Sequence, residues 1–287
     1  MPNTRQILQR IKTAGNIAKI TKAMEMVSAS KMRRAQEQAL ATRPYTQALQ
    51  HSLSTLVSAS STASHPLMES HTEGVPVVLL ISTDKGLCGS LNPNLFKQLI
   101  DWSHHHQTGQ VVAVGKKAVN FCRFAGLPMI AQFTELPDVM KPGDILPMSS
   151  LVSSHFLDKT FNSVTIIYMD FITTLVQKVR SIQLLPLPKI EATQSIVKAD
   201  ATSEFIFEPS PREILDQLLP YYLENSIYQA FLESRASEHS ARMVSMKNAS
   251  DNAKELVGEL RLVFNKSRQA SITSELLDIT TAMLAQQ

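Results

Sequence analysis

Residues 82–89 form the segment whose side chains offer the most chemistry, and they read STDKGLCG. The segment follows an apolar run and precedes a helical pattern, the place where α/β sheets commonly bind phosphate groups. Its spacing fits neither GxGxxG nor GxxxxGK followed by Ser or Thr, so the backbone amides and the lysine are not spaced to cradle a nucleotide. We interpret the segment as a structural turn.

Histidines and cysteines are the other residue types that could hold a metal or act as a nucleophile. His104, His105 and His106 are consecutive, so on a helix they project in different directions and cannot converge on one ion. Cys88 and Cys122 are the only cysteines, too few for a disulfide scaffold or for paired CxxC zinc ligands. No His or Asn is placed by the sequence beside Cys88, and no pair of carboxylates stands out. The sequence therefore predicts no catalytic residue, no cofactor and no metal site in this chain.

The elements that position these residues are divided by helix breakers. Twelve of the 14 prolines lie between Pro66 and Pro220, so the two ends of the chain are almost free of them. A helix over the 67 residues after Pro220 would extend about 100 Å, and one over residues 3–43 about 60 Å. We expect Pro44 to kink or end the N-terminal helix.

Both ends repeat small or apolar residues at alternating steps of three and four. The N-terminal series is Ile7, Ile11, Ala14, Ala18, Thr21, Glu25, Ser28, Met32, Ala35, Ala39 and Thr42. The C-terminal series is Met246, Ala249, Ala253, Leu256, Leu260, Val263, Ser267, Ala270, Ser274, Leu277, Thr281 and Leu284. Small side chains let two helices approach closely, so we expect a long antiparallel coiled coil formed by the N- and C-terminal helices. The alternative, two core helices of a bundle, lacks further helices of matching length.

Between the ends, short apolar runs alternate with helical patterns. Strands are expected at residues 77–82, 111–114, 129–133, 164–171 and 177–185, and helices at 94–104, 116–125 and 148–160, with residues 205–207 beside a polar linker. This alternation predicts an α/β fold with a Rossmann-like, mostly parallel sheet. The expected domains are an N-terminal coiled-coil helix at 1–60, an α/β foot domain at 75–208 and a C-terminal coiled-coil helix at 210–287.

Charge is unevenly distributed along the chain. The formal net charge is only +3, yet residues 1–43 hold nine basic side chains against Glu25 and Glu37. These residues include no aromatic side chain on which a base could stack, which argues against nucleic-acid binding. The more specific interpretation is that the positive helix face meets an acidic protein surface.

The C-terminal tip is apolar. No basic residue follows Arg268. Residues 275–284 contain Leu276, Leu277, Ile279, Met283 and Leu284, and only Glu275 and Asp278 among them are charged. A helix end free in water favours Lys or Arg in its last turns. We therefore expect another protein to enclose this tip.

Four runs resemble the γ subunit of the F-type ATP synthase, in the same order and spacing over essentially the whole chain. They are residues 20–34 (ITKAMEMVSASKMRR), 84–89 (DKGLCG), 236–252 (ASEHSARMVSMKNASDN) and 265–276 (NKSRQASITSEL). The resemblance implies a central rotor shaft that hydrolyses nothing itself. Its partners would be the α3β3 hexamer, the ε subunit and the membrane c ring.

The resemblance also places contact residues. Met24 and its basic neighbours Lys22, Arg33 and Arg34, with Arg242 on the other helix, would face the levers of the β subunits. A polar catch of Arg268, Gln269, Thr273 and Glu275 would hydrogen-bond the surrounding subunits, and Phe207 and Glu208 would touch the c ring and ε. For each of these residues the alternative is an ordinary solvated surface.

The resemblance and the composition together predict a cellular location. No apolar run approaches the roughly 20 residues that cross a bilayer, so membrane association would come through the complex only. The chain lacks the inserted segment and cysteine pair of plastid members, and no transit peptide is visible before Ile7. We expect a peripheral protein at the cytoplasmic face of a bacterial inner membrane.

Two rival functions remain open on the sequence alone. A small α/β enzyme with helical oligomerisation arms would bind a nucleotide or substrate by itself. A basic coiled-coil protein would bind DNA with a salt dependence of several counterions.

Overall fold

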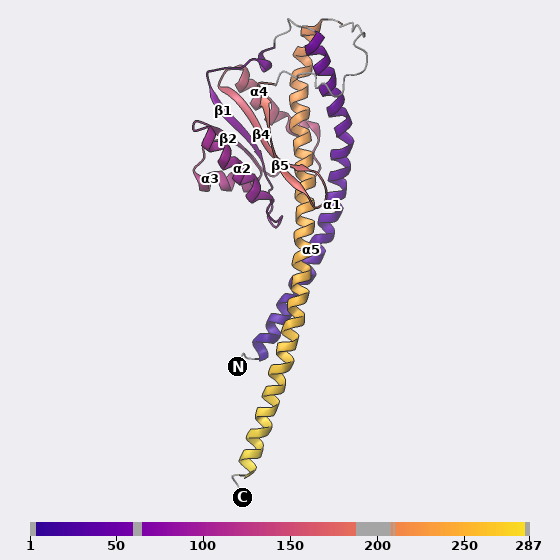
Figure 1. Cartoon of the computed structure of the whole chain (residues 1–287), viewed down its shortest axis with the longest axis vertical. Coiled ribbons are helices and arrows are strands. Elements are labelled where there is room, and N and C mark those ends of the chain that lie inside the picture. Colours follow the sequence, from indigo (N-terminus) through magenta and orange to yellow (C-terminus); the bar gives the residue numbers. More distant parts are fainter. Residues whose placement is uncertain (1–3, 60–64, 188–207, 209, 285–287) are drawn as a thin grey trace. The chain divides into compact units, whose positions relative to one another are not determined.

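The computed structural model describes residues 4–59, 65–187, 208 and 210–284, and two long helices run through it (Figure 1). Helix α1 spans Thr4–Ala59 and helix α5 spans Pro211–Leu284, 56 and 74 residues. The chain divides into two compact units. Met1–Ala29 with Arg242–Gln287 form the coiled-coil unit, and Ser30–Ala241 form the sheet unit.

The coiled-coil unit pairs the first part of α1 with the last part of α5 in antiparallel directions (Figure 1). Every predicted seam position of α1 from Ile7 to Ser28 is buried or half-buried. The Ser250 hydroxyl donates a hydrogen bond to the backbone oxygen of Ala18 at 3.3 Å, which requires close helices. Small seam residues permit this approach, and the predicted antiparallel coiled coil is confirmed.

The predicted C-terminal seam is wrong at two positions and too long, while Met246, Ala249, Ala253, Leu260, Ser267 and Ala270 are buried or half-buried as predicted. Leu256 and Val263 are both 46% exposed, and Val257 and Phe264 are half-buried in their place. Both shifts are by one residue and the following predicted position is half-buried again, so the seam stays on the same helix face. From Ile272 onward every described residue of α5 is exposed, because no described segment of this unit pairs with it.

Proline does not end the first helix. The helix α1 continues through Pro44 to Ala59, contrary to one of the two outcomes predicted for this position. Proline removes one N–H donor and leaves the carbonyl of Leu40 without its usual partner. Both residues are exposed, so water can bond the carbonyl. At the start of α5, the Ser210 hydroxyl accepts a hydrogen bond from Glu213 N at 3.3 Å and caps the helix.

The sheet unit contains a five-stranded sheet in the order β3-β2-β1-β4-β5. The strands are β1 (Val75–Ile81), β2 (Gln110–Val114), β3 (Met129–Phe133), β4 (Phe161–Phe171) and β5 (Gln177–Leu185). The first four are parallel to one another and β5 is antiparallel to β4, which confirms the predicted mostly parallel α/β fold. The link from β4 to β5 has five residues, too few for the crossover that a parallel pair needs.

Helices cover both faces of this sheet. One buried cluster combines α2 (Leu91–His105) and α3 (Lys116–Ala125) with side chains such as Val78 and Leu80 of β1. The other combines α4 (Leu146–Leu157), α1 and α5 with Val77, Leu79 and Ile81. The run of β1 is buried on both faces, as expected for a central parallel strand.

Candidate partner-binding surfaces

The turn at residues 82–89 uses its polar side chains to hold its own backbone. The Thr83 hydroxyl donates to Lys85 O at 2.7 Å, and Asn92 Nδ2 donates to Thr83 Oγ1 at 2.8 Å. Asp84 Oδ1 accepts from the backbone N–H of Lys116 at 3.0 Å, where α3 begins. These bonds tie the ends of β1 and β2 to the helices that follow them, the role of a structural turn.

The two thiols are buried, and two of the three consecutive histidines are hydrogen-bonded within the fold. Cys88 and Cys122 are both buried, and burial raises the pKa of the Cys122 thiol to about 11, so it is not a thiolate at neutral pH. The ring nitrogens of His105 and His106 bond carbonyl oxygens of their own helix at 2.6 and 2.9 Å. Within the described residues, no three His, Cys, Asp or Glu side chains gather closely enough to hold a metal ion.

The predicted basic contact residues are exposed on α1, but the predicted arginine of α5 is buried. In the coiled-coil unit Lys22 is exposed and forms an ion pair with Glu25 at 3.0 Å, while Met24 is half-buried. Arg242 of the same unit is only 8% exposed, so little of it is available to a partner. In the sheet unit Arg33 and Arg34 are exposed, and Arg33 lies 3.4 Å from Glu37.

The four predicted catch residues are all exposed on α5 within the coiled-coil unit. Gln269 and Thr273 are four residues apart and share a helix face, and the Thr273 hydroxyl donates to the backbone oxygen of Gln269 at 2.9 Å. Arg268 and Glu275 are two turns apart and share the neighbouring face. The helix therefore presents polar groups of both charges along about two turns.

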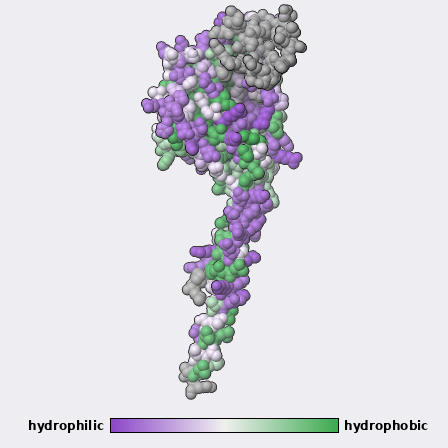
Figure 2. Space-filling view, viewed as in Figure 1, coloured by the Kyte–Doolittle hydropathy of each residue, from purple (hydrophilic) through white to green (hydrophobic). Residues whose placement is uncertain are grey.

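The apolar tip follows directly on the same helix (Figure 2). Its large side chains expose 54–70% of their surface, and they are Leu276, Leu277, Ile279, Met283 and Leu284. A row of exposed apolar side chains this long on one helix is typical of a protein–protein contact.

Two residues were predicted to contact the c ring and ε. Phe207 lies outside the described residues, and Glu208 is exposed.

A buried polar cluster in the sheet unit was missed by the sequence analysis. Gln229 of α5 donates from Nε2 to Glu233 Oε1 at 2.9 Å and accepts from the Thr42 hydroxyl of α1 at 2.6 Å. Arg43 lies 3.4 Å from the same Glu233 and donates to Phe171 O of β4 at 3.0 Å. These bonds join α1, α5 and the sheet. Only the i, i+4 spacing of Gln229 and Glu233 is visible in sequence, because their partners are about 190 residues away.

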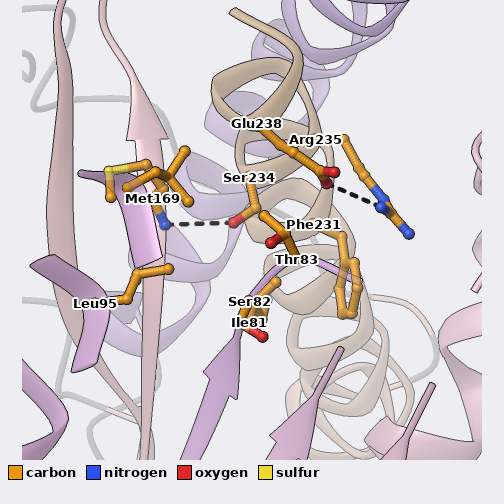
Figure 3. A pocket seen from close by; sticks show the side chains of 10 residues that line it. Ile81, Ser82, Thr83, Leu95, Met169, Phe231, Ser234, Arg235 and Glu238 are labelled. Atoms are coloured by element: carbon orange, nitrogen blue, oxygen red, sulfur yellow. Dashed lines mark hydrogen bonds and ion pairs between the residues drawn. The ribbon is translucent and has the colours of Figure 1, made fainter. Parts of the chain in front are cut away.

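A second polar cluster lines a small cavity where β1 ends (Figure 3). Arg235 of α5 lies 3.0 Å from Glu238 and 3.8 Å from Asp84 of the turn. Ser234 Oγ accepts from the backbone N–H of Met169 at 3.3 Å. The cavity of about 10 Å³ is close to the size of one water molecule, so it has no room for a substrate.

Comparisons with known proteins cover almost the whole chain. A family model described as "ATP synthase" matches residues 3–285. The "ATP synthase gamma chain" of Methylacidiphilum infernorum is 40% identical, over 99% of this chain and 99% of its own length. The protein of the same name from Dehalococcoides mccartyi is 44% identical over 97% of each chain.

Solved structures support the fold. A chain from the Euglena gracilis mitochondrial ATP synthase, described as OSCP/F1/c-ring in rotational state 3, has a TM-score of 0.68 at 20% identity and covers 98% of this chain and 94% of that chain. A chain from the Tetrahymena thermophila mitochondrial ATP synthase, described as central stalk/c-ring, has a TM-score of 0.64 at 24% identity and covers 80% and 99%.

Proposed function

This chain belongs to the ATP synthase family as a gamma chain, and from that premise we propose how its surfaces serve the central rotor shaft. The shaft couples proton-driven rotation of the c ring to sequential conformational change at the three catalytic β sites of the F1Fo ATP synthase. The result is ATP synthesis or, in reverse, ATP-driven proton pumping. The main support for this use of the surfaces comes from the end of α5, where exposed polar residues are followed by an exposed apolar tip.

Rotation works through differential contact. An asymmetric rod inside three equivalent sites contacts each of them differently, and a contact can shift a conformational equilibrium only by the difference in its binding free energy for the two states. Turning the rod therefore changes the nucleotide affinities of the three sites in sequence. This role needs exposed contact residues on the chain and no catalytic group.

The partners are the α3β3 hexamer, the ε subunit and the c ring. We assign the apolar tip and the catch residues Arg268, Gln269, Thr273 and Glu275 to the hexamer. The exposed Lys22, Arg33 and Arg34, with Met24 and the small exposed part of Arg242, would face acidic levers of the β subunits. Phe207 and Glu208 are assigned to the c ring and ε.

The chain is a peripheral part of a membrane-associated complex. Among the described residues, none of the helices combines enough length and hydrophobicity to span a bilayer. We place the chain at the cytoplasmic face of a bacterial inner membrane, a proposal supported by the bacterial origin of the two gamma chains of similar sequence named above.

The rotor role is tested by native mass measurement after the full chain is mixed with α and β subunits. We expect one copy of the chain for every three α and three β subunits, because one rod fills the axis of a threefold ring. A mixture of β subunits alone with the chain serves as the control and should give no such complex. Failure of the three components to assemble would contradict the proposal.

The catch assignment predicts a loss of coupling. Arg268→Ala or Thr273→Val should lower ATP synthesis in membrane vesicles by about 5-fold, because each removes one hydrogen bond to a neighbouring subunit worth about 1 kcal/mol. Lys266→Ala, at an exposed position of the same helix, is the matched control and should leave synthesis unchanged. Normal ATP synthesis in both catch variants would refute the assignment.

A further inference from the structure

A larger cavity, open to solvent on part of its surface, lies in the sheet unit between residues of α1, α5, β4 and β5. Its volume is about 720 Å³, and residues from all four elements line it. Cavities that bind small organic molecules commonly have volumes of about 300–1,000 Å³. The cavity is therefore large enough for such a ligand, unlike the one drawn in Figure 3.

The polar part of this cavity contains an acceptor without a donor. The Glu233 side chain is only 7% exposed and lines the cavity. Its Oε1 accepts from Gln229 Nε2 at 2.9 Å and lies 3.4 Å from Arg43 Nε. No N–H or O–H donor of the described residues bonds its buried Oε2, and the side chain hydrogen-bonds the Asp170 carboxyl, which two carboxyls can do only when they share a proton. A buried carboxylate oxygen without a donor is costly, so the site lacks any donor to this pair other than the shared proton.

The missing donor should be positively charged. Asp170 of β4 lines the same cavity, and burial together with this neighbouring carboxyl raises the pKa of Glu233. The two arginines of the cavity are already engaged, since Arg43 donates to Phe171 O and Arg180 lies 3.5 Å from Asp170 Oδ2. A cation beside the two carboxyls would favour ionised Glu233 and replace the proton that burial otherwise retains.

The remaining wall suits an apolar body. Ile166, Leu184, Leu187 and Leu223 line the cavity together with the rings of Tyr168 and Tyr222. Aromatic faces attract cations as well as apolar groups. The lining thus combines one deep acidic corner with an apolar and aromatic surround.

We propose that this cavity is a binding site for a small organic cation, whose ammonium, amidinium or guanidinium group donates to Glu233 Oε2 and whose apolar body lies against Tyr168, Tyr222 and Leu223. None of the residues that line the cavity is among those assigned to the partner subunits. The proposed cation site does not depend on the rotor function, because its test uses the chain alone.

Benzamidine is the probe, because it places a planar amidinium on an aromatic ring. Benzamide has nearly the same shape without the charge and is the matched control ligand. Both are titrated into the full chain and followed by saturation-transfer NMR. We expect benzamide to bind about 10-fold more weakly, the loss of one hydrogen bond between charged groups. Equal binding of the two ligands would overturn the proposal.

Three variants locate the binding. Glu233→Gln should weaken benzamidine binding by about 10-fold, because the amide lacks the negative charge. Gln47→Trp, at an exposed position of α1 that lines the cavity, should narrow the cavity at its mouth and weaken binding. Glu238→Gln is the matched control, since Glu238 is a buried glutamate of the same helix that lies outside this cavity. The affinity of this variant for benzamidine should stay within about twofold of that of the unchanged chain.

Two results would reject the site. Unchanged affinity in Gln47→Trp, or an equal loss in Glu238→Gln and Glu233→Gln, shows that benzamidine binds elsewhere. Circular dichroism checks that each variant is folded. If Glu233→Gln fails to fold, the comparison of benzamide with benzamidine and the Gln47→Trp variant decide the question.

Discussion

Phe231→Ala should lower the free energy of unfolding by about 3–5 kcal/mol, the range for removing a buried aromatic ring. Phe231 belongs to α5, is 2% exposed and is part of the core cluster between the helices and the sheet. It also lines the small cavity at the end of β1 (Figure 3). Removal of the ring would enlarge a cavity that already exists, and the rigid sheet beside it cannot collapse to fill the space. Urea unfolding of the full chain, followed by circular dichroism, measures the loss.

Phe124 provides the control for this prediction. It is a phenylalanine of α3 that is 91% exposed, so Phe124→Ala should change stability by no more than about 0.5 kcal/mol. A loss at Phe231 as small as that at Phe124 would show that α5 is not anchored to the sheet by this ring.

The strands and short helices were predictable because burial leaves a local pattern. The expected bounds of 129–133, 177–185 and 116–125 match β3, β5 and α3. The helix α2 begins at Leu91, three residues earlier than predicted, because Pro93 fits within a first helical turn, where its missing N–H costs nothing. The sequence pattern thus predicts the middle of each helix or strand better than its ends.

Long-range features were harder to predict from one sequence. The seam of α1 followed its heptads, but that of α5 slipped from Leu256 to Val257, since burial depends on which residue the partner helix presents. The Glu233 cluster was missed for the same reason, because Arg43 is 190 residues away. The exposed catch residues could be named only through resemblance, since an exposed polar helix face has no distinguishing local pattern.

Gly115→Ala should cost about 3 kcal/mol, the sum of backbone strain and a steric clash. Gly115 joins β2 to α3 with φ of +89° and ψ of 145°, a backbone conformation that residues other than glycine rarely adopt. A Cβ at this position would lie 2.6 Å from Ser82 O and 2.9 Å from Ser82 Oγ. Ser82 cannot move aside easily, because its N–H and hydroxyl both donate to Val114 O at 2.9 Å and its Oγ accepts from Ala118 N.

Gly126→Ala separates the two causes of that loss. Gly126 ends α3 with φ of +66°, and an added Cβ there meets no atom within 4 Å. Its substitution should therefore cost only the left-handed backbone strain of about 1 kcal/mol. Thermal unfolding of both variants gives the comparison. Equal losses would mean that the contact between residue 115 and Ser82 relaxes freely. A larger loss for Gly115→Ala would show that the ends of β1 and β2 are held rigidly at the turn where Asp84 meets α3.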